Sequence, residues 1–330
     1  MATLVTGGNG WVPSHIVRRL ARRGETVVSY DLMPPDDALR EMLGPLAGQV
    51  LFEEGDVTDR ERLQRAAERH GVTAIVHAAV ITPRTDRERR EPERIIGVNY
   101  GGTVNALEVA RGLPGLRRFV YVSSGAVFGE QPPGATKVDE TSPANATTLY
   151  GITKLASERT ALRYGDLFGM DVVALRPSNV YGPMERFTPG YVGATQLREM
   201  LRIHFDEHQP IKVASLQGPH LDWTYVEDIA EGVERAWAHE EPPPHRVYCL
   251  TSGRLYSVGE VLDAFRRNVP GLEYRVVPPA EANFPGTADE PPGPLPSSAR
   301  MLADFGWAPS TPFEAGMEQY LAWIMAHGPQ

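Results

Sequence analysis

The sequence has one cysteine, Cys249, no long apolar run and fewer basic than acidic residues. A single cysteine cannot form an intramolecular disulfide, and it leaves a cysteine-based zinc site short of ligands. No stretch approaches the roughly 18 consecutive apolar residues of a membrane-spanning helix, so we expect no membrane partner. The 33 Lys and Arg residues are outnumbered by 42 Asp and Glu residues, which gives a net charge of -9. Nucleic-acid binding is therefore not expected, because it requires clustered positive charge.

The composition is that of an ordinary globular protein, with 330 residues of which 42% are hydrophobic and 23% charged. This length suits one large domain or two closely joined ones with an ample core. Apolar residues begin at Ala2 and meet a glycine at Gly7, which leaves no room for a signal peptide. Together with the single cysteine, these features predict a cytoplasmic protein.

Short β-rich runs alternate with helical stretches through about residue 176, a pattern typical of an α/β protein with helices on both faces of a parallel sheet. Most of the runs are continuously apolar, as expected of strands buried on both faces. Helical spacing occupies residues 12–23 and 59–70. The expected strands lie at residues 3–5, 26–30, 50–52, 74–76, 119–122 and 172–175.

A glycine-containing turn, with Gly7 and Gly10, follows the first expected strand and precedes the first helix. Such a turn lets backbone amides approach a pyrophosphate at the positive end of a helix. The second strand ends at Asp31, whose carboxylate suits the two hydroxyls of an adenosine ribose and would repel a 2′-phosphate. No arginine follows at Leu32 or Met33 to hold such a phosphate. The pattern favours NAD over NADP, with a strand-end turn as the alternative role of Asp31.

Position 13, where the dinucleotide fingerprint has its third glycine, is Pro13. Proline is tolerated in a first helical turn, because the amide it lacks would have no partner there. Its ring adds bulk where the helix and the strand pack closely. We therefore expect an altered approach of the cofactor and not the loss of the site.

Tyr150 and Lys154 are four residues apart and therefore lie on one face of an expected helix. A neighbouring cation lowers the pKa of a phenol, which allows it to act as a base. Ser124 follows the fifth expected strand, where its hydroxyl can hydrogen-bond a substrate oxygen beside the phenol. The alternative is a surface Tyr/Lys pair with a serine that merely caps a strand end. Combined with the glycine turn and Asp31, the pattern favours catalysis.

The sequence resembles the extended short-chain dehydrogenase/reductase family, in its NAD-dependent epimerase/dehydratase group, over nearly its whole length. The resemblance implies a Rossmann-type doubly wound parallel sheet with a smaller C-terminal substrate-binding lobe. It assigns residues 1–176, and about 214–250, to the NAD-binding domain, and residues 177–213 and 251–330 to the lobe. Family members often dimerise through two helices, which here would span about 93–112 and 149–165. The matching segments are TGGNGWVP at 6–13, GDVTD at 55–59, HAA at 77–79, VNYGGT at 98–103, YVSSGAVFG at 121–129, YGITK at 150–154, RPSNVYGP at 176–183, DWTYVEDIAEG at 222–232 and FGWAPSTPFEAG at 305–316.

The resemblance also implies site residues. Tyr150 would be the base, Lys154 would bind the nicotinamide ribose, and Ser124 would polarise the reacting hydroxyl. Asn99 would brace the sheet near the cofactor. The full expected set for NAD, besides Tyr150 and Lys154, is Gly7, Asn9, Gly10, Trp11, Asp31, Asp56, Val57, His77, Ala78, Ala79, Asn99, Val122, Pro177 and Asn179. The expected substrate contacts are Arg84, Ser124, Gly125, Ala126 and Asn179, and no metal is expected. For Arg84, the alternative is that the charged run at residues 84–94 is a solvated segment that enters a helix.

Three departures from the family pattern concern the substrate. Sugar-nucleotide dehydratases carry an Asp-Glu pair where this chain has Gly125 and Ala126, so dehydration is not expected. Sugar-nucleotide epimerases carry an arginine that would align with Leu221 and another that would fall near residues 291–294, and this chain has neither. Without these clamps for a diphosphate, we expect a smaller substrate, such as a sugar, a sugar acid or a polyol acid. The alternative is that Arg186, Arg198, Arg202 or Arg254 reaches the pocket by another route.

These features predict an NAD-dependent oxidation of a secondary hydroxyl, with release of the oxidised product. The alternatives are a UDP-sugar 4-epimerase with tightly bound NAD and, more remotely, a non-catalytic NAD-sensing regulator. His204 and His208 enclose an H-x-x-E-H pattern that some zinc peptidases use. Pro210 follows at once, so we interpret the pattern as a solvated helix end and set it aside.

Overall fold

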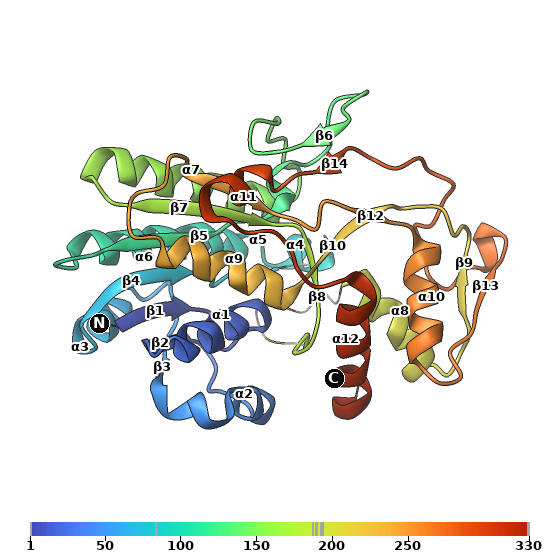
Figure 1. The fold of residues 1–330 in the computed structure, drawn as a ribbon, viewed down its shortest axis with the longest axis horizontal. Coiled ribbons are helices and arrows are strands. Elements are labelled where there is room, and N and C mark those ends of the chain that lie inside the picture. Colours follow the sequence, from blue (N-terminus) through green and yellow to red (C-terminus); the bar gives the residue numbers. More distant parts are fainter. Residues whose placement is uncertain (1, 83–84, 187, 189–190, 192–194, 329–330) are drawn as a thin grey trace.

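The computed structural model describes residues 2–82, 85–186, 188, 191 and 195–328. Its main feature is a seven-stranded sheet in the order β11-β7-β5-β4-β1-β2-β3, in which all neighbours are parallel (Figure 1). The predicted doubly wound α/β architecture is thereby confirmed, and each of the six expected strands is present. The sheet comprises β1 (Ala2–Thr6), β2 (Thr26–Asp31), β3 (Val50–Glu54), β4 (Val72–His77), β5 (Arg118–Val122), β7 (Val172–Pro177) and β11 (Val247–Leu250).

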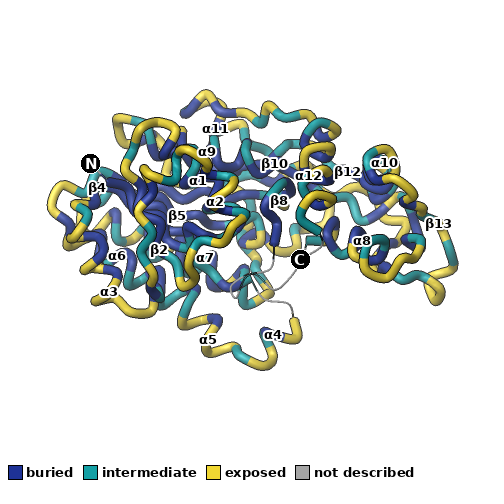
Figure 2. The backbone as a smooth tube through the Cα atoms, turned by 90° about the horizontal axis from the view of Figure 1, so that it is seen from below, coloured by how far each residue is buried: buried dark blue, intermediate teal, exposed yellow. Residues whose placement is uncertain are grey.

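Helices cover both faces of this sheet because successive strand residues point to opposite sides. Val5 and Val76 belong to a core that includes residues of α1 (Trp11–Arg22) and α9 (Val226–Ala238). Their neighbours Leu4 and Ile75 belong to a second core, which includes residues of α3 (Arg60–Arg69), α6 (Gly102–Gly112) and α7 (Leu149–Phe168). Figure 2 shows these strands as the most continuously buried part of the backbone. None of the described helices combines the length and apolarity needed to cross a bilayer.

A smaller lobe lies beside the carboxyl ends of the strands, at the right of Figure 1. Its strands are β8 (Asn179–Tyr181), β9 (Ile211–Val213), β10 (Leu221–Tyr225), β12 (Leu255–Tyr256) and β13 (Tyr274–Val276). They form a three-stranded sheet, β12-β10-β8, and the pair β13-β9. The helices α8 (Gln196–Phe205), α10 (Val258–Asn268) and α12 (Phe313–His327) pack in this part of the molecule. The short strands β6 (Lys137–Val138) and β14 (Leu295–Pro296) pair with each other.

Asp222 of β10 fastens the lobe to the large sheet. Its buried carboxylate accepts hydrogen bonds from the Ser178 hydroxyl at 2.6 Å and from the Gly253 amide at 3.0 Å. Ser178 directly follows β7, and Gly253 lies shortly after β11. One carboxylate therefore holds the start of β10 against two strands of the large sheet, and this fixes the wall of the crevice between the two parts.

Candidate active site

A cavity of about 1000 Å³ lies at the carboxyl edge of the parallel strands, between the large sheet and the smaller lobe. This is where doubly wound proteins bind their ligands, because the loops after the strands open there. The volume is at the upper end of the roughly 300–1,000 Å³ typical of ligand pockets. The cavity is therefore of a size that suits a large ligand.

The glycine turn forms one wall of the cavity. Gly7 has a φ of 68°, and a Cβ there would lie 2.9 Å from the backbone of Ala79, so a larger residue would push the two loops apart. The Asn9 amide donates to Asp31 Oδ2 at 3.0 Å, and the Met33 amide donates to Oδ1 at 3.1 Å. Burial raises the pKa of the Asp31 carboxyl, and these amides oppose the rise. A close backbone turn and a fixed carboxylate together fit the pyrophosphate and the ribose of NAD.

Pro13 also lines the cavity, in the first turn of α1. The Cδ of its ring lies 3.7 Å from where a Cβ on Gly10 would stand. The helix thus begins at Trp11 with proline in place of the fingerprint's third glycine. The sequence-based expectation of an altered cofactor approach remains a prediction.

Helix α7 contributes Tyr150 and Lys154 to the cavity lining. Its first turn is capped by Thr148, whose side chain accepts from the Gly151 amide at 3.1 Å. A Cβ on Gly151 would lie 2.7 Å from the carbonyl oxygen of Ala126. Glycine therefore allows the start of α7 to approach the turn that follows β5, where Ser124 is located.

The environment of Tyr150 combines burial with two hydroxyl partners. Burial raises the pKa of its phenol, whereas hydrogen bonding with the hydroxyls of Ser124 and Thr82 lowers it. Lys154 Nζ lies 5.9 Å from the centre of the Tyr150 ring and donates to the carbonyl oxygen of Val122 at 2.6 Å. These groups form a proton-accepting site only if the ammonium is charged, because only the cation stabilises a phenolate.

Burial lowers the pKa of Lys154 to about 7. Above that pH the unfolded chain still binds a proton at this lysine while the folded chain does not, so the lysine's contribution to the free energy of unfolding grows as the pH rises. We expect wild-type protein to gain stability relative to Lys154→Met between about pH 6 and about pH 9, measured by urea unfolding. The comparison is Lys212→Met, which removes a lysine at a half-buried site outside the described cavity lining. A constant difference for Lys154→Met would contradict the prediction.

Two predicted cofactor residues lie behind the cavity wall. His77 is fully buried, and its ring bonds Thr6 Oγ1 at 2.8 Å and Thr103 Oγ1 at 3.1 Å. Burial and the charge of Lys154 lower the pKa of His77 to about 3, so the ring stays neutral. Asn99 lies in a π-helical turn and donates to the carbonyl oxygen of Ile81 at 3.0 Å. The His77 ring thus links β4 to β1 and α6, and Asn99 holds the loop after β4. Neither side chain is part of the described cavity lining.

A buried ion pair joins the elements that carry the catalytic candidates. Glu158, two helical turns after Tyr150, accepts from Arg176 Nη2 at 2.6 Å and from the Ser123 hydroxyl at 2.8 Å. Ser123 precedes Ser124, and Arg176 precedes Pro177. One carboxylate therefore holds α7, the end of β5 and the end of β7 in register.

The structure brings most of the predicted site residues to one cavity. Arg84 lies outside the described residues, and the sequence did not reveal Thr82, whose place beside the phenol depends on tertiary packing. Glu158 continues the four-residue spacing of Tyr150 and Lys154, a signal that the sequence did contain. The predicted residues that line the cavity are Gly7, Asn9, Gly10, Trp11, Asp31, Asp56, Val57, Ala78, Ala79, Val122, Ser124, Gly125, Ala126, Tyr150, Lys154, Pro177 and Asn179.

Leu221, where the resemblance implies the first arginine, lines the cavity, as does Pro294 from the stretch 291–294 where the second was expected. The arginines of the described lining each have a carboxylate partner. Arg94 pairs with Glu91, Arg176 with Glu158, and Arg186 with Asp36. The described part of the wall thus contains no arginine that lacks an acidic neighbour.

The H-x-x-E-H pattern does not form a metal site in the described structure. Helix α8 ends at Phe205, so His204 is helical, whereas His208 lies beyond the helix with a φ of 52°. Among the described residues, no group of three or more His, Cys, Asp or Glu side chains is arranged to hold a metal ion.

Comparison with known proteins identifies the family. The family model described as "NAD dependent epimerase/dehydratase family" matches residues 3–250. The chain is 30% identical to a UDP-glucose 4-epimerase of Erwinia amylovora, over 84% of this chain and 86% of that protein. It is 32% identical to a 3 beta-hydroxysteroid dehydrogenase/Delta 5-->4-isomerase of Mycobacterium tuberculosis, over 82% of this chain and 70% of that protein. The relatives thus include both epimerases and a dehydrogenase.

Solved structures of UDP-glucose 4-epimerases have a fold similar to that of this chain. The UDP-glucose 4-epimerase of Thermus thermophilus, in complex with NAD, is 28% identical with a TM-score of 0.78, and the match covers 99% of this chain and 100% of that one. The enzyme of Bifidobacterium longum, at 22% identity, has a TM-score of 0.83 over 100% and 99% of the two chains and shows the fold alone. From the family match, these similarities and the nucleotide-binding geometry, the chain belongs to the NAD-dependent epimerase/dehydratase family of extended short-chain dehydrogenases/reductases and is an NAD-dependent enzyme.

Proposed function

We propose that this enzyme oxidises a secondary hydroxyl group of a sugar, sugar acid or polyol-type substrate. The observation that carries the proposal is the grouping of Tyr150, Ser124 and Lys154 on the wall of the cavity that also contains the glycine turn. The phenolic oxygen of Tyr150 would accept the hydroxyl proton, and the Ser124 hydroxyl would donate a hydrogen bond to the same substrate oxygen. NAD, when bound, would accept the hydride.

Each residue has a distinct task in this proposal. Burial disfavours the phenolate of Tyr150, so proton abstraction depends on the hydroxyls of Ser124 and Thr82 and on the Lys154 ammonium. The carbonyl oxygen of Val122 fixes the ammonium in place. Asp31 would hold the adenosine ribose. Apart from the hydride transfer, all of this chemistry is positioning and proton transfer by the chain's own groups.

Dehydrogenation of a small substrate is the preferred form of this reaction. The described wall has no arginine without a carboxylate partner, and Leu221 and Pro294 stand where a diphosphate clamp would be expected. Binding a diphosphate in such a pocket would leave its charges poorly matched. A neutral or singly charged polyol would leave fewer charges unmatched in that pocket, so its binding would be less unfavourable.

Epimerisation of a UDP-sugar is the second candidate. It is favoured by the relatives and structural neighbours that are named UDP-glucose 4-epimerases. The first half of that reaction would use the same groups of this chain, since an epimerase also begins by oxidising a hydroxyl. The two functions differ in whether the ketone and the reduced cofactor remain bound until the hydride returns.

The deciding experiment incubates the purified protein with NAD and, separately, with sugars, aldonic acids, uronic acids and UDP-sugars. Net dehydrogenation produces NADH absorbance in proportion to product. Epimerisation of UDP-glucose to UDP-galactose, detected by chromatography without NADH, would replace the first proposal by the second. If neither NADH nor an isomer formed with any of these compounds, both proposals would be contradicted.

We also propose that the protein is a homodimer. Helix α7 packs against α6 and the π-helical turn at residues 97–101. Ile96, just before that turn, and Ile152, on α7, are apolar side chains that are 44% and 45% exposed. We expect Ile96→Glu combined with Ile152→Glu to produce a monomer in light scattering, because two buried charges would oppose association. Leu302→Glu, at a 54% exposed position on α11 (Ala299–Phe305), is the control and should leave the mass unchanged. A monomeric wild-type protein would contradict the proposal.

We propose a division of the chain into one part that binds NAD and one that binds the substrate. Residues 1–176 and about 214–250 would form the NAD-binding domain, and residues 177–213 and 251–330 the substrate-binding lobe. The positions of β11 in the large sheet and of α9 on its face support this division, whereas β10, within residues 214–250, pairs with β8 and β12 of the smaller lobe. A cytoplasmic location is proposed from the use of NAD and from the single cysteine, which is buried and unpaired.

A further inference from the structure

Arg186 reaches from the start of the smaller lobe to the glycine turn. The residue is 3% exposed although it lies in a segment without regular secondary structure. Its Nη2 donates to the carbonyl oxygen of Asn9 at 2.8 Å, and its Nε donates to Asp36 Oδ2 at 2.5 Å. These contacts join residues that are 177 and 150 positions apart in the chain.

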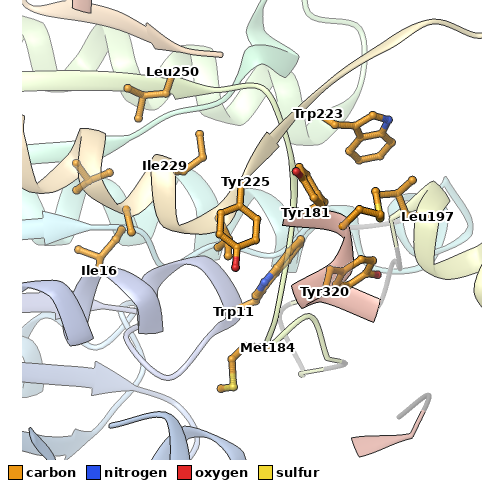
Figure 3. Close-up of a cluster of buried hydrophobic side chains, with 14 of the residues drawn as sticks. Trp11, Ile16, Tyr181, Met184, Leu197, Trp223, Tyr225, Ile229, Leu250 and Tyr320 are labelled. Carbon is orange, nitrogen blue, oxygen red and sulfur yellow. The ribbon is translucent and has the colours of Figure 1, made fainter. Parts of the chain in front are cut away.

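The residues that precede Arg186 are also attached to the first helix of the NAD-binding domain. Trp11 Nε1 donates to the carbonyl oxygen of Pro183 at 2.8 Å. The Trp11 ring lies 5.7 Å from the ring of Tyr191, measured between centroids. Figure 3 shows Trp11 and Met184 in the shared apolar cluster at this boundary. The segment at residues 183–186 therefore contacts the start of α1 through Trp11 and the glycine turn through the hydrogen bond of Arg186.

Glu185 connects the same segment to the C-terminal helix. Its fully buried carboxylate accepts from the Tyr320 hydroxyl of α12 at 2.6 Å, from the Tyr191 hydroxyl at 3.0 Å and from the Thr195 amide at 2.9 Å. Figure 3 shows Tyr320 in the same cluster as Trp11. The residue next to Arg186 is thus anchored to the smaller lobe.

We propose that Asn9, Asp36 and Arg186 form a clasp that slows the release of the dinucleotide. All three residues line the cavity, as does Asp31. Burial raises the pKa of the Asp31 carboxyl, and the charge of the Arg186 guanidinium lowers it. A cofactor seated on the glycine turn would lie between that turn and the lobe segment. Its departure requires the two sides to separate, which breaks the charge-assisted hydrogen bonds of Arg186.

The clasp has a direct consequence for turnover. Net oxidation requires NADH to leave after each cycle, and closed sites often make such a step rate-limiting. Slow exchange would also keep the reduced cofactor beside the oxidised substrate. This inference rests on the NAD site of the proposed function and adds the residues that control how long the cofactor remains there.

The test measures the dissociation of NADH by stopped-flow fluorescence, with excess NAD as the competitor. The variants are Asp36→Asn and Arg186→Met. Asparagine is as good a helix cap as aspartate, so Asp36→Asn keeps the cap of α2 (Asp37–Leu43) while removing the charge that pairs with Arg186. We expect both variants to release NADH about tenfold faster, with little change in the association rate. The matched control is Asp37→Asn, which removes the adjacent exposed charge and should leave the dissociation rate unchanged.

Two outcomes would overturn the inference. If the wild type binds NADH and both variants release it at the wild-type rate, the clasp is wrong while the proposed function stands. If Asp37→Asn accelerates release as much as Asp36→Asn, the loss of any negative charge near the start of α2 is enough to explain the effect. The proposed clasp would then also be wrong. Failure of the wild type to bind NADH would instead overturn the NAD site and, with it, the proposed function.

Discussion

We expect the replacement of Tyr150 with phenylalanine to lower the rate of hydride transfer by about 10²–10⁴-fold, the range for the loss of a positioned general base. Phenylalanine keeps the ring that packs in the cavity wall and removes only the oxygen that would accept the proton. The hydrogen-bonding partners Ser124 and Thr82 remain in place. The affinity for NADH, measured by calorimetry, should therefore change little while the maximal rate falls.

The control for this experiment is Tyr164→Phe, on the same helix. Its hydroxyl donates to the carboxylate of Glu108 at 2.8 Å, and neither residue belongs to the described cavity lining. This variant should turn over at the wild-type rate. Near-full activity of Tyr150→Phe would show that another group takes the proton, and the proposed mechanism would have to be abandoned.

Replacing Glu158 with glutamine lowers the free energy of unfolding by about 3–5 kcal/mol, because it leaves a buried guanidinium without its counter-charge. The side chains of Arg176 and Glu158 are 3% and 1% exposed. Arg176→Met should be similarly damaging, since it leaves the carboxylate unpaired. The double variant should lose less than the sum of the two single losses, because no unpaired charge remains. Urea unfolding of all four proteins gives the coupling energy.

A surface pair provides the comparison. Glu61 and Arg65 are four residues apart on α3, with side chains 85% and 60% exposed. Breaking that pair should cost less than about 1 kcal/mol, because water replaces the lost partner. If Glu158→Gln were as mild as Glu61→Gln, the ion pair would not hold the three catalytic elements together.

The proposed clasp favours epimerisation, whereas the missing diphosphate clamps favour oxidation of a small substrate. The product assay distinguishes these two functions. Retention of the cofactor suits a reaction in which the hydride returns, whereas a pocket without free arginines in its described wall suits a small substrate. A dehydrogenase with a working clasp should show a burst of NADH on the enzyme before slower steady release. A UDP-sugar epimerase should show no free NADH at all.

The sequence by itself determined the strands of the large sheet and the placement of the proposed catalytic pair on one helix, because both follow from local spacing. Buried parallel strands are continuous apolar runs, and a four-residue interval places Tyr150 and Lys154 on one helix face whatever surrounds them. The turn at Gly7 and the strand-end Asp31 are also local, since each depends on the conformation of a few neighbouring residues.

Only the tertiary structure decided which side chains surround these groups. Thr82 meets the phenol through the loop after β4, and His77 and Asn99 were expected at the cofactor but lie behind the wall. Arg186, considered from the sequence only for the substrate side, instead bonds Asn9 across 177 residues. Such contacts form only when distant segments pack together, and the spacing of residues along the chain does not record which distant segment will lie beside a given loop.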